Sequence, residues 1–555
     1  MTRLKRMSSL AAVLGTTVLV AACGSTASQS SDQLASDQTL RFPIQDDVEY
    51  LDPGHSSSAV DITFLANLYD GLVRFDDNLK IVPAIAESLP TISSDGLTWT
   101  FKLRKNAKFS NGDPVTTKDV IYSWTRTARL NDAYASVFDP LKGVADVESG
   151  KATTISGLQA KDDYTLVATL TQPAGYWLSE LALPTASMIV NQKAIEKFGE
   201  DKWWQTPAGL IGTGAYKMTE RTPKASMDFE AVPNWWGGST GSLKKVHVDI
   251  VTDLASAVQK YEAGGYDLVG MANQPLGAED ALRFKNDATK AKQLTLFPAA
   301  RSTWIGYNEL KGPFKGIQEG KEGRRAFSLA VNRDQLVDVA CAKGALCIKA
   351  TGGVMAKGLK GYLGDNADPN AKFDPAAAKA ALQKWDPTGS KSKGLQYRFN
   401  ATPFNTKVAE NLQSQWKANL GVTVDLLPSD FPTLIKQRKA KETIMFRDSW
   451  SADYDHPQDW FDNLFICAQA PPGKQNYAAY CNPQMDQVIS TADQVSDISK
   501  SVPDYIKAQR MMIDDVVFGA LFYTVQSYLT KPYVRGAGYN SLYDHYWSSV
   551  KLLQH

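Results

Sequence analysis

The chain has 555 residues, of which 43% are hydrophobic and 10% aromatic, so it can bury large cores and its length predicts several domains. Its 60 Lys and Arg nearly balance its 59 Asp and Glu, which gives a formal net charge of +1. Because no strong basic field exists, we expect no nucleic-acid partner.

The first 22 residues have the features of a secretion signal. Basic residues at positions 3, 5 and 6 precede an apolar run over 10–22, which is too short to cross a bilayer as a helix. Cys23 directly follows Val20-Ala21-Ala22, which resembles the bacterial lipobox; a chance cysteine is the alternative. We therefore predict a lipoprotein signal peptide over 1–22, a membrane anchor on lipidated Cys23 and a flexible tether over 23–37, rich in Ser, Gln, Thr and Ala.

Strand and helix patterns alternate in the first half of the chain. Residues 97–103 alternate apolar and polar side chains, which predicts a strand. Thr116 to Asp119 resembles a capping box, and it begins a helix with Val120, Ile121 and Trp124 on its buried side. Further along, an alternating strand at 246–250, a helical run at 255–263 and a strand at 266–271 predict a β-α-β unit.

A second α/β series follows after about residue 304. Strands are predicted at 395–400, 422–427 and 443–447, and helices at 407–420 and 432–441. Open parallel sheets bind ligands beyond the carboxyl ends of their strands. Arg447, Trp450 and Asp453, at the end of the last strand, are therefore candidates for lining a cleft, and a solvated loop is the alternative.

The four cysteines after Cys23 are grouped as Cys341 with Cys347 and Cys467 with Cys481. Disulfides are expected in an exported protein. Three pairings are possible, and we favour the two local ones because their partners are close in sequence. No C-x-x-C motif occurs, so the sequence indicates neither zinc binding nor redox chemistry.

Several sequence blocks, in order, resemble the peptide-binding cluster of ABC-transporter solute-binding proteins, the extracellular solute-binding proteins of family 5. The resemblance covers nearly the whole mature chain. The blocks are Asn111-Gly112-Asp113-Pro114-Val115-Thr116 leading into Val120-Ile121-Tyr122-Ser123-Trp124, Gly212-Thr213-Gly214-Ala215-Tyr216 with Pro233-Asn234-Trp235-Trp236-Gly237-Gly238, and Ala452-Asp453-Tyr454-Asp455-His456-Pro457.

This resemblance implies an α/β fold of the periplasmic-binding-protein type, with two lobes joined by a hinge and an extra subdomain inserted in lobe I. We expect lobe I in residues 38–73, 207–303 and 522–555, the extra subdomain in 74–206 and lobe II in 304–521. Closure of such lobes around a ligand is a hinge motion that removes the ligand from water.

The resemblance also assigns roles to single residues. Asp453 matches the acid that pairs with the ligand's α-amino group, and a buried ammonium needs such a partner; capping a helix or turn is the alternative role. Arg447, Arg438 and Lys311 match cations that meet ligand carboxylates, although the basic run around Arg438 is also typical of a solvated helix face.

Two aromatic positions and two departures complete the expected ligand site. Tyr134 and Trp450 match aromatic residues that line the peptide channel, with core packing as the alternative. Asn405 stands where oligopeptide binders have a carboxylate-binding His, and Phe431 replaces a Trp. These departures leave ligand length and recognition of the ligand's C-terminus open.

We therefore expect a monomeric receptor, lipid-anchored on the outer face of the cytoplasmic membrane, that captures peptides and delivers them to an ABC permease with its ATPase subunits. We expect no catalytic activity, cofactor or metal. Within the same fold, an oligosaccharide, favoured by Trp235, Trp236 and Trp450, or a metal chelate is the alternative ligand. An adhesive or signalling lipoprotein is a further alternative.

Two other site types fit the sequence poorly. The segment 237–241 satisfies the G-x-S-x-G pattern of hydrolases, but it follows a polar turn and no helix begins after it. Calcium could be imagined at Asp453, Asp455, Asp459 and Asp462, but Pro457 interrupts their spacing and the glycine of a calcium loop is missing.

Overall fold

The computed structural model describes residues 33–132, 134–271, 274–537, 540, 542, 544 and 546–555. The predicted signal peptide, Cys23 and most of the predicted tether lie outside these residues. Within the described part of the chain, no helix is both long and apolar enough to span a membrane.

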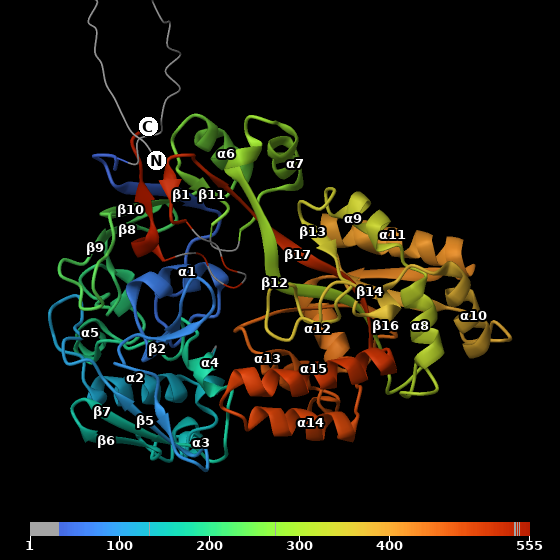
Figure 1. Ribbon diagram of the computed structural model, residues 1–555, viewed down its shortest axis with the longest axis horizontal. Coiled ribbons are helices and arrows are strands. Elements are labelled where there is room, and N and C mark those ends of the chain that lie inside the picture. Colours follow the sequence, from blue (N-terminus) through green and yellow to red (C-terminus); the bar gives the residue numbers. More distant parts are fainter. Residues whose placement is uncertain are drawn as a thin grey trace, which may run out of the picture.

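Lobe I is built on a four-stranded sheet, at the left of Figure 1. The strand order is β1 (Thr39–Ile44), β10 (Lys245–Ile250), β9 (Ser226–Ala231) and β8 (Tyr216–Thr222), with β1 parallel to β10 and the other pairs antiparallel. Alternating side chains of these strands enter a core that also contains the buried side chains of α1 (Ala59–Leu68). Near this sheet lie α5 (Gln192–Phe198) and α6 (Leu254–Glu262).

The two ends of the described chain meet in lobe I. The Ala35 N–H donates to the Leu552 carbonyl at 2.9 Å, and the Gln38 side chain both donates to that carbonyl at 2.7 Å and accepts from the Leu552 N–H at 3.1 Å. Leu552 lies in β19 (Lys551–Leu552), which pairs with β18 (Val534–Arg535). The final residues therefore complete lobe I.

The extra subdomain contains a second four-stranded sheet, which is antiparallel throughout. Its order is β4 (Thr91–Ile92), β5 (Thr98–Lys102), β7 (Thr165–Thr169) and β6 (Leu158–Asp162), and a hairpin of β2 (Val73–Phe75) and β3 (Ile81–Pro83) precedes it. The predicted capping box at the start of α2 (Thr117–Leu130) is confirmed, with Val120 and Trp124 fully buried. The shorter helices are α3 (Val144–Glu148) and α4 (Trp177–Leu181).

Lobe II surrounds a seven-stranded sheet. Its strands run in the order β11 (Leu268–Val269), β17 (Phe518–Thr530), β12 (Leu294–Tyr307), β16 (Met445–Ser451), β14 (Leu395–Asn400) and β15 (Val424–Ser429), and β13 (Cys347–Lys349) pairs with β17. One core joins the sheet to α8 (Lys321–Leu329), α9 (Arg333–Ala340), α10 (Pro375–Trp385) and α11 (Pro403–Leu420). The opposite face packs on α13 (Gln458–Leu464), α14 (Pro483–Asp493) and α15 (Ile498–Asp515). The sheet also contacts α12 (Phe431–Lys439), whereas α7 (Ala278–Asn286) lies beside the start of β12.

The long strands β12 and β17 connect the lobes (Figure 1). They pair antiparallel from Leu294 opposite Leu529 to Gly306 opposite Phe518, with a register irregularity between Pro298 and Ser302. Such an irregularity bends and twists a strand locally. The lobe boundaries expected at 303/304 and 521/522 fall inside these two strands.

The strand, helix and strand of the expected β-α-β unit are present as β10, α6 and β11, but the two strands are not neighbours. β11 pairs with β17, and β1 lies between β11 and β10, since the Asp267 N–H donates to the Arg41 carbonyl. One predicted strand boundary was wrong. The last predicted strand ends at Ser451, not at Arg447, because its polar residues continue the ladder with β12 as far as Arg301 opposite Ser451. Arg447 and Trp450 are therefore strand residues.

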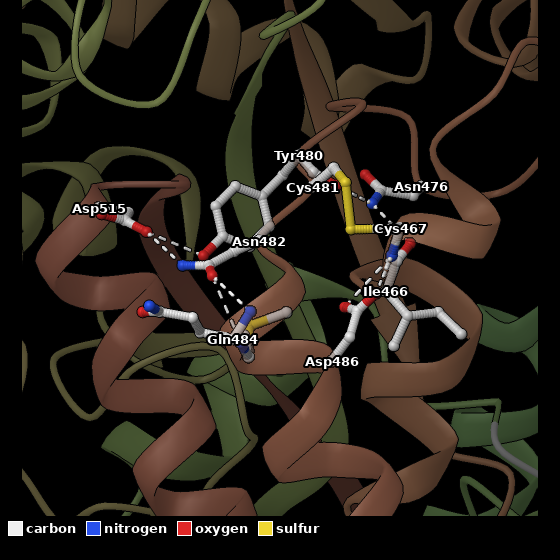
Figure 2. The surroundings of a disulfide bond; sticks show 10 residues. Ile466, Cys467, Asn476, Tyr480, Cys481, Asn482, Gln484, Asp486 and Asp515 are labelled. Atoms are coloured by element: carbon white, nitrogen blue, oxygen red, sulfur yellow. Dashed lines mark hydrogen bonds between the residues drawn. A yellow bond between two sulfur atoms is a disulfide. The ribbon is translucent and has the colours of Figure 1, made fainter.

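Two disulfides join Cys341 to Cys347 and Cys467 to Cys481, with Cα–Cα distances of 5.1 and 4.4 Å. Figure 2 shows the second one. There the Cys467 N–H donates to the Asp486 carboxylate at 3.1 Å, and the Asn476 amide donates to the Tyr480 carbonyl at 2.7 Å. This disulfide therefore closes the loop that leads into α14.

Candidate functional site

A cavity of about 330 Å³ lies between the lobes. Its walls come from lobe I (Ser57, Ala59, Ile62, Thr63, Pro275, Asn540, Leu542, Asp544), the extra subdomain (Tyr134), lobe II (Ser451, Ala452, Asp453) and the connecting strands (Ala299, Ala300, Arg301, Thr524, Gln526, Tyr528). Every part of the fold thus contributes, and the volume falls in the range of small-molecule sites.

Asp453 is held in this cavity by groups from both sides. The Tyr134 hydroxyl donates to Asp453 Oδ1 at 2.9 Å, across the boundary between the extra subdomain and lobe II. On the lobe II side, the Asp453 N–H and the Trp450 indole N–H both donate to Asp459 Oδ2, at 3.0 and 3.1 Å. The carboxyl of Asp453 is therefore fixed where it faces the cavity.

The electrostatics of this group follow from burial. Burial raises the pKa of Asp453 to about 6, and the hydrogen bond from Tyr134 acts in the opposite direction. Burial, together with the neighbouring Asp453, raises the pKa of Asp459 well above its usual range. The arrangement therefore offers the cavity the carboxyl of Asp453, supported by a second buried carboxyl, Asp459, whose pKa is also raised.

The lobe I wall presents another acid. Asp544 is buried and accepts hydrogen bonds from the Thr63 hydroxyl at 2.9 Å and from the Tyr528 hydroxyl at 3.0 Å. Thr63 comes from α1 and Tyr528 from β17, so the acid lies where lobe I meets a connecting strand. Asp544, Thr63 and Tyr528 all lie outside the sequence blocks that predicted the site.

A single cation, Arg301 of β12, lines the cavity among the residues that the structure describes. Its side chain is accessible to solvent, yet the surrounding protein lowers the pKa of its guanidinium through desolvation. No sequence pattern pointed to Arg301, because it lies far from the other site residues along the chain. It is the strand pairing with Ser451 that brings it close to Asp453.

The predicted cations lie outside the lining of this cavity. Arg447 and Arg438 are buried, and Arg438 Nη1 donates to the Asp448 carboxylate at 2.7 Å and to the Arg447 carbonyl at 3.0 Å. Its guanidinium also stacks over Tyr477, 4.3 Å from the ring centroid. Lys311 is exposed in the loop after β12.

The other predicted residues differ in their contacts. Tyr134 lines the cavity, whereas Trp450 lies behind it and donates to Asp459. Asn405 is buried in the first turn of α11, where its amide donates to the carbonyl and side-chain oxygens of Asn400, both at 3.1 Å. Of the seven predicted ligand residues, the cavity therefore brings together Tyr134 and Asp453.

A second contact links the extra subdomain to lobe II. The Tyr454 hydroxyl donates to the Glu180 carboxyl at 3.1 Å, and the Gly175 N–H donates to the Asp493 carbonyl at 2.6 Å. Burial raises the pKa of Glu180 well above its usual range and that of Asp493 to about 8. The contact between the extra subdomain and lobe II therefore includes the buried carboxyl of Glu180, whereas Asp493 takes part through its backbone carbonyl.

The comparison with known proteins decides the family. A family model described as bacterial extracellular solute-binding proteins, family 5 Middle, matches residues 80–472. The chain belongs to the family 5 extracellular solute-binding proteins. The resemblance predicted from the sequence blocks is thus confirmed.

Individual family 5 proteins match over almost the whole chain. The periplasmic oligopeptide-binding protein OppA of Salmonella typhimurium is 28% identical over 547 residues, which cover 97% of each protein. The unliganded open form of the murein tripeptide-binding protein MppA is 25% identical and superposes with a TM-score of 0.81 over 94% of this chain and 99% of that one. Haemophilus influenzae OppA in complex with RPPGFSPFR is 26% identical, with a TM-score of 0.69 over 94% and 100%.

These matches confirm the two-lobed periplasmic-binding-protein fold. Family 5 membership also makes the chain an extracellular solute-binding protein.

Proposed function

We propose that this protein captures peptides in the interlobe cavity and delivers them to the permease of an ABC importer. The observation that carries the proposal is Asp453, a carboxyl that faces the cavity and is held by Tyr134 from the opposite side. An ammonium group leaving water needs an anionic partner, and the α-amino group of a peptide supplies the matching cation. The peptide-binding relatives support the same ligand class.

The ligand's α-amino group pairs with Asp453 when the lobes close. Closure excludes water from that pair, which strengthens the attraction between the two charges. The higher affinity of the ligand for the closed form drives closure. Varied peptide side chains are accommodated through water, which satisfies polar groups at small entropic cost. Among the more distant cations of the expected site, Arg447, Arg438 and Lys311 are candidates for the carboxylates of longer peptides.

The protein works from a lipid anchor on Cys23, as a monomer and without catalytic chemistry. The tether keeps the receptor beside its permease and ATPase subunits, which raises their effective concentration for each other. Ser239, in the only G-x-S-x-G pattern of the sequence, lies in the loop between β9 and β10, where its hydroxyl accepts from the Gly241 N–H at 3.0 Å. This turn supports no nucleophile role.

An oligosaccharide ligand has less support. Trp235 and Trp236, which favoured it in the sequence, both donate their indole N–H to the Thr213 carbonyl, at 2.9 and 2.8 Å, and neither lines the cavity. A metal chelate is the other alternative. No group of three or more His, Cys, Asp or Glu among the described residues is arranged to hold a metal ion.

Native mass spectrometry of a soluble form beginning at Ser25, purified without denaturant, tests the proposal. Retained peptides, released by unfolding and sequenced, are the expected result. Calorimetry with free-amine peptides and their N-acetylated forms is the second measurement, and the acetylated forms should bind far more weakly. A retained sugar or chelate, or equal affinity of both peptide forms, would contradict the proposal.

A further inference from the structure

Arg301 combines three properties that separate it from the other cations of the chain. It lines the cavity that also contains Asp453. It lies next to the register irregularity of β12, where the two lobes are joined. Among the described residues its solvent-accessible guanidinium has no hydrogen-bond or ion-pair partner, whereas the buried guanidinium groups of Arg126, Arg324, Arg333 and Arg438 all have one.

Neither of the two acids in the same cavity forms an ion pair with Arg301. Ser451 lies opposite Arg301 in the ladder between β12 and β16, and Asp453 follows two residues later. The Asp453 carboxyl nevertheless points to Tyr134 and keeps a raised pKa, which an adjacent guanidinium would lower. The second acid, Asp544, accepts hydrogen bonds from the Thr63 and Tyr528 hydroxyls. The cavity therefore holds two acids and one cation, and the cation is paired with neither acid.

A second guanidinium strengthens the positive end. Arg447 lies on the neighbouring strand β16, and its pKa is lowered to about 10 by burial and then by the proximity of Arg301. Arg447 Nε has no hydrogen-bond partner in the described part of the structure, and the nearby Asp448 already pairs with Arg438. Two neighbouring cations without a dedicated acid favour the binding of an external anion.

We infer that Arg301 binds the C-terminal carboxylate of the peptide whose amino group pairs with Asp453. The inference rests on the proposed function, and it adds a specificity-determining residue to it. A zwitterionic ligand matches the separated charges of the cavity, and a guanidinium suits a carboxylate because it can donate two parallel hydrogen bonds. Since Arg301 is part of a strand that connects the lobes, the carboxylate would be held at the connection between them.

The inference is tested with a cycle of protein and ligand changes, measured by calorimetry. The peptides are those that the wild-type protein binds, each as free acid and as C-terminal amide. The variants are Arg301→Gln and Arg301→Lys, with Arg510→Gln as the matched control, because Arg510 is an exposed arginine of α15 outside the cavity lining. Circular dichroism and thermal unfolding check that each variant is folded.

We expect Arg301→Gln to weaken binding of the free acids by about 30-fold or more, the range for truncating one partner of a hydrogen-bonded charge pair. Binding of the amides should change little, so that the acid-to-amide ratio of the wild type collapses. Arg301→Lys should retain part of the preference, and Arg510→Gln all of it.

Three results would overturn the inference. Equal loss for acids and amides would make Arg301 a structural residue of the hinge. Unchanged affinity for both would show that another group binds the carboxylate, and a loss confined to peptides with acidic side chains would assign Arg301 to a side-chain pocket. If the wild type binds no peptide in any form, the proposed function fails as well, which separates the two failures.

Discussion

Replacement of Asp453 by Asn tests the amine-binding role most directly. The variant keeps the size of the side chain and an oxygen that can accept the hydrogen bond from Tyr134, so it removes mainly the charge. A free-amine peptide would then place its ammonium in the cavity without an anion. Truncating one partner of a buried charge pair costs about 2 to 5 kcal/mol, which corresponds to about 30-fold or more in Kd.

The pH dependence of peptide affinity gives a second, independent estimate of how much the charge of Asp453 contributes. The pKa of Asp453 is raised to about 6, so at pH 7 roughly 90% of the carboxyl is ionised and at pH 5 roughly 10%. Only the ionised form pairs with the ammonium, and affinity scales with the competent fraction. Wild-type affinity should therefore fall about tenfold between pH 7 and pH 5, whereas Asp453→Asn should bind weakly at both values with little change.

Calorimetry at pH 5, 6 and 7 with free-amine and N-acetylated peptides is the assay. Asp514→Asn, which changes an exposed acid of α15, is the control. The reasoning is refuted if Asp453→Asn and the wild type bind free-amine peptides equally at pH 7. It is also refuted if the variant loses N-acetylated peptides by the same factor, because those ligands have no ammonium to pair.

Three further changes test other parts of the structure. Tyr134→Phe removes the hydrogen bond that lowers the pKa of Asp453, so the pH midpoint of peptide binding should move above 6. About 1 kcal/mol of binding free energy should be lost at pH 7, and an unchanged midpoint in calorimetry would contradict this. Asp493 has a folded-state pKa of about 8 against 3.8 for an ordinary Asp, so the folded protein binds the extra proton in this window and stability falls as pH rises through it. Asp493→Asn should remove up to about 1.4 kcal/mol per pH unit of that slope in urea unfolding between pH 5 and 7, and parallel slopes for both proteins would be inconsistent with the assignment. The paired change Cys467→Ser with Cys481→Ser opens a loop with a sequence separation of 14, and the same unfolding assay should show a loss of about 3 kcal/mol in the free energy of unfolding. Reduction of the wild type, which also opens Cys341–Cys347, should cost at least as much.

Much of the local structure could be predicted from the sequence, because the signals are local. The capping box at Thr116 specifies where α2 begins, and the Gly421 C-cap specifies where α11 ends. The end of β16 escaped prediction, because polar residues such as Asp448 read as a loop. Pairing with β12 keeps them in a strand, and Arg438 supplies the partner that makes Asp448 tolerable there.

The candidate site likewise contains residues that the sequence predicts and residues that only long-range contacts bring in. Asp453 lies in a recognisable sequence block and Tyr134 at a position that matches an aromatic residue of the family, and the structure brings them within hydrogen-bond distance. Arg301 and Asp544 lie in no such block, and only the long-range pairing of strands and the return of the chain to lobe I put them into the same cavity. The basic run around Arg438 also shows why composition misleads: Lys436 is exposed as the run predicts, but Arg438 is buried and donates to the Arg447 carbonyl of β16.

The meeting of the two chain ends in lobe I has a consequence for the order of folding. Ala35 and Gln38 take their partners from Leu552, so the first strand of the lobe cannot acquire these contacts until the last residues have emerged from the ribosome. Most elements of lobe II, by contrast, lie between β12 and β17 in sequence and can begin to pack earlier. Contacts between residues so distant in sequence also form slowly. A secretion machinery that threads extended chains would therefore meet a protein whose first lobe is still open, which favours export before folding.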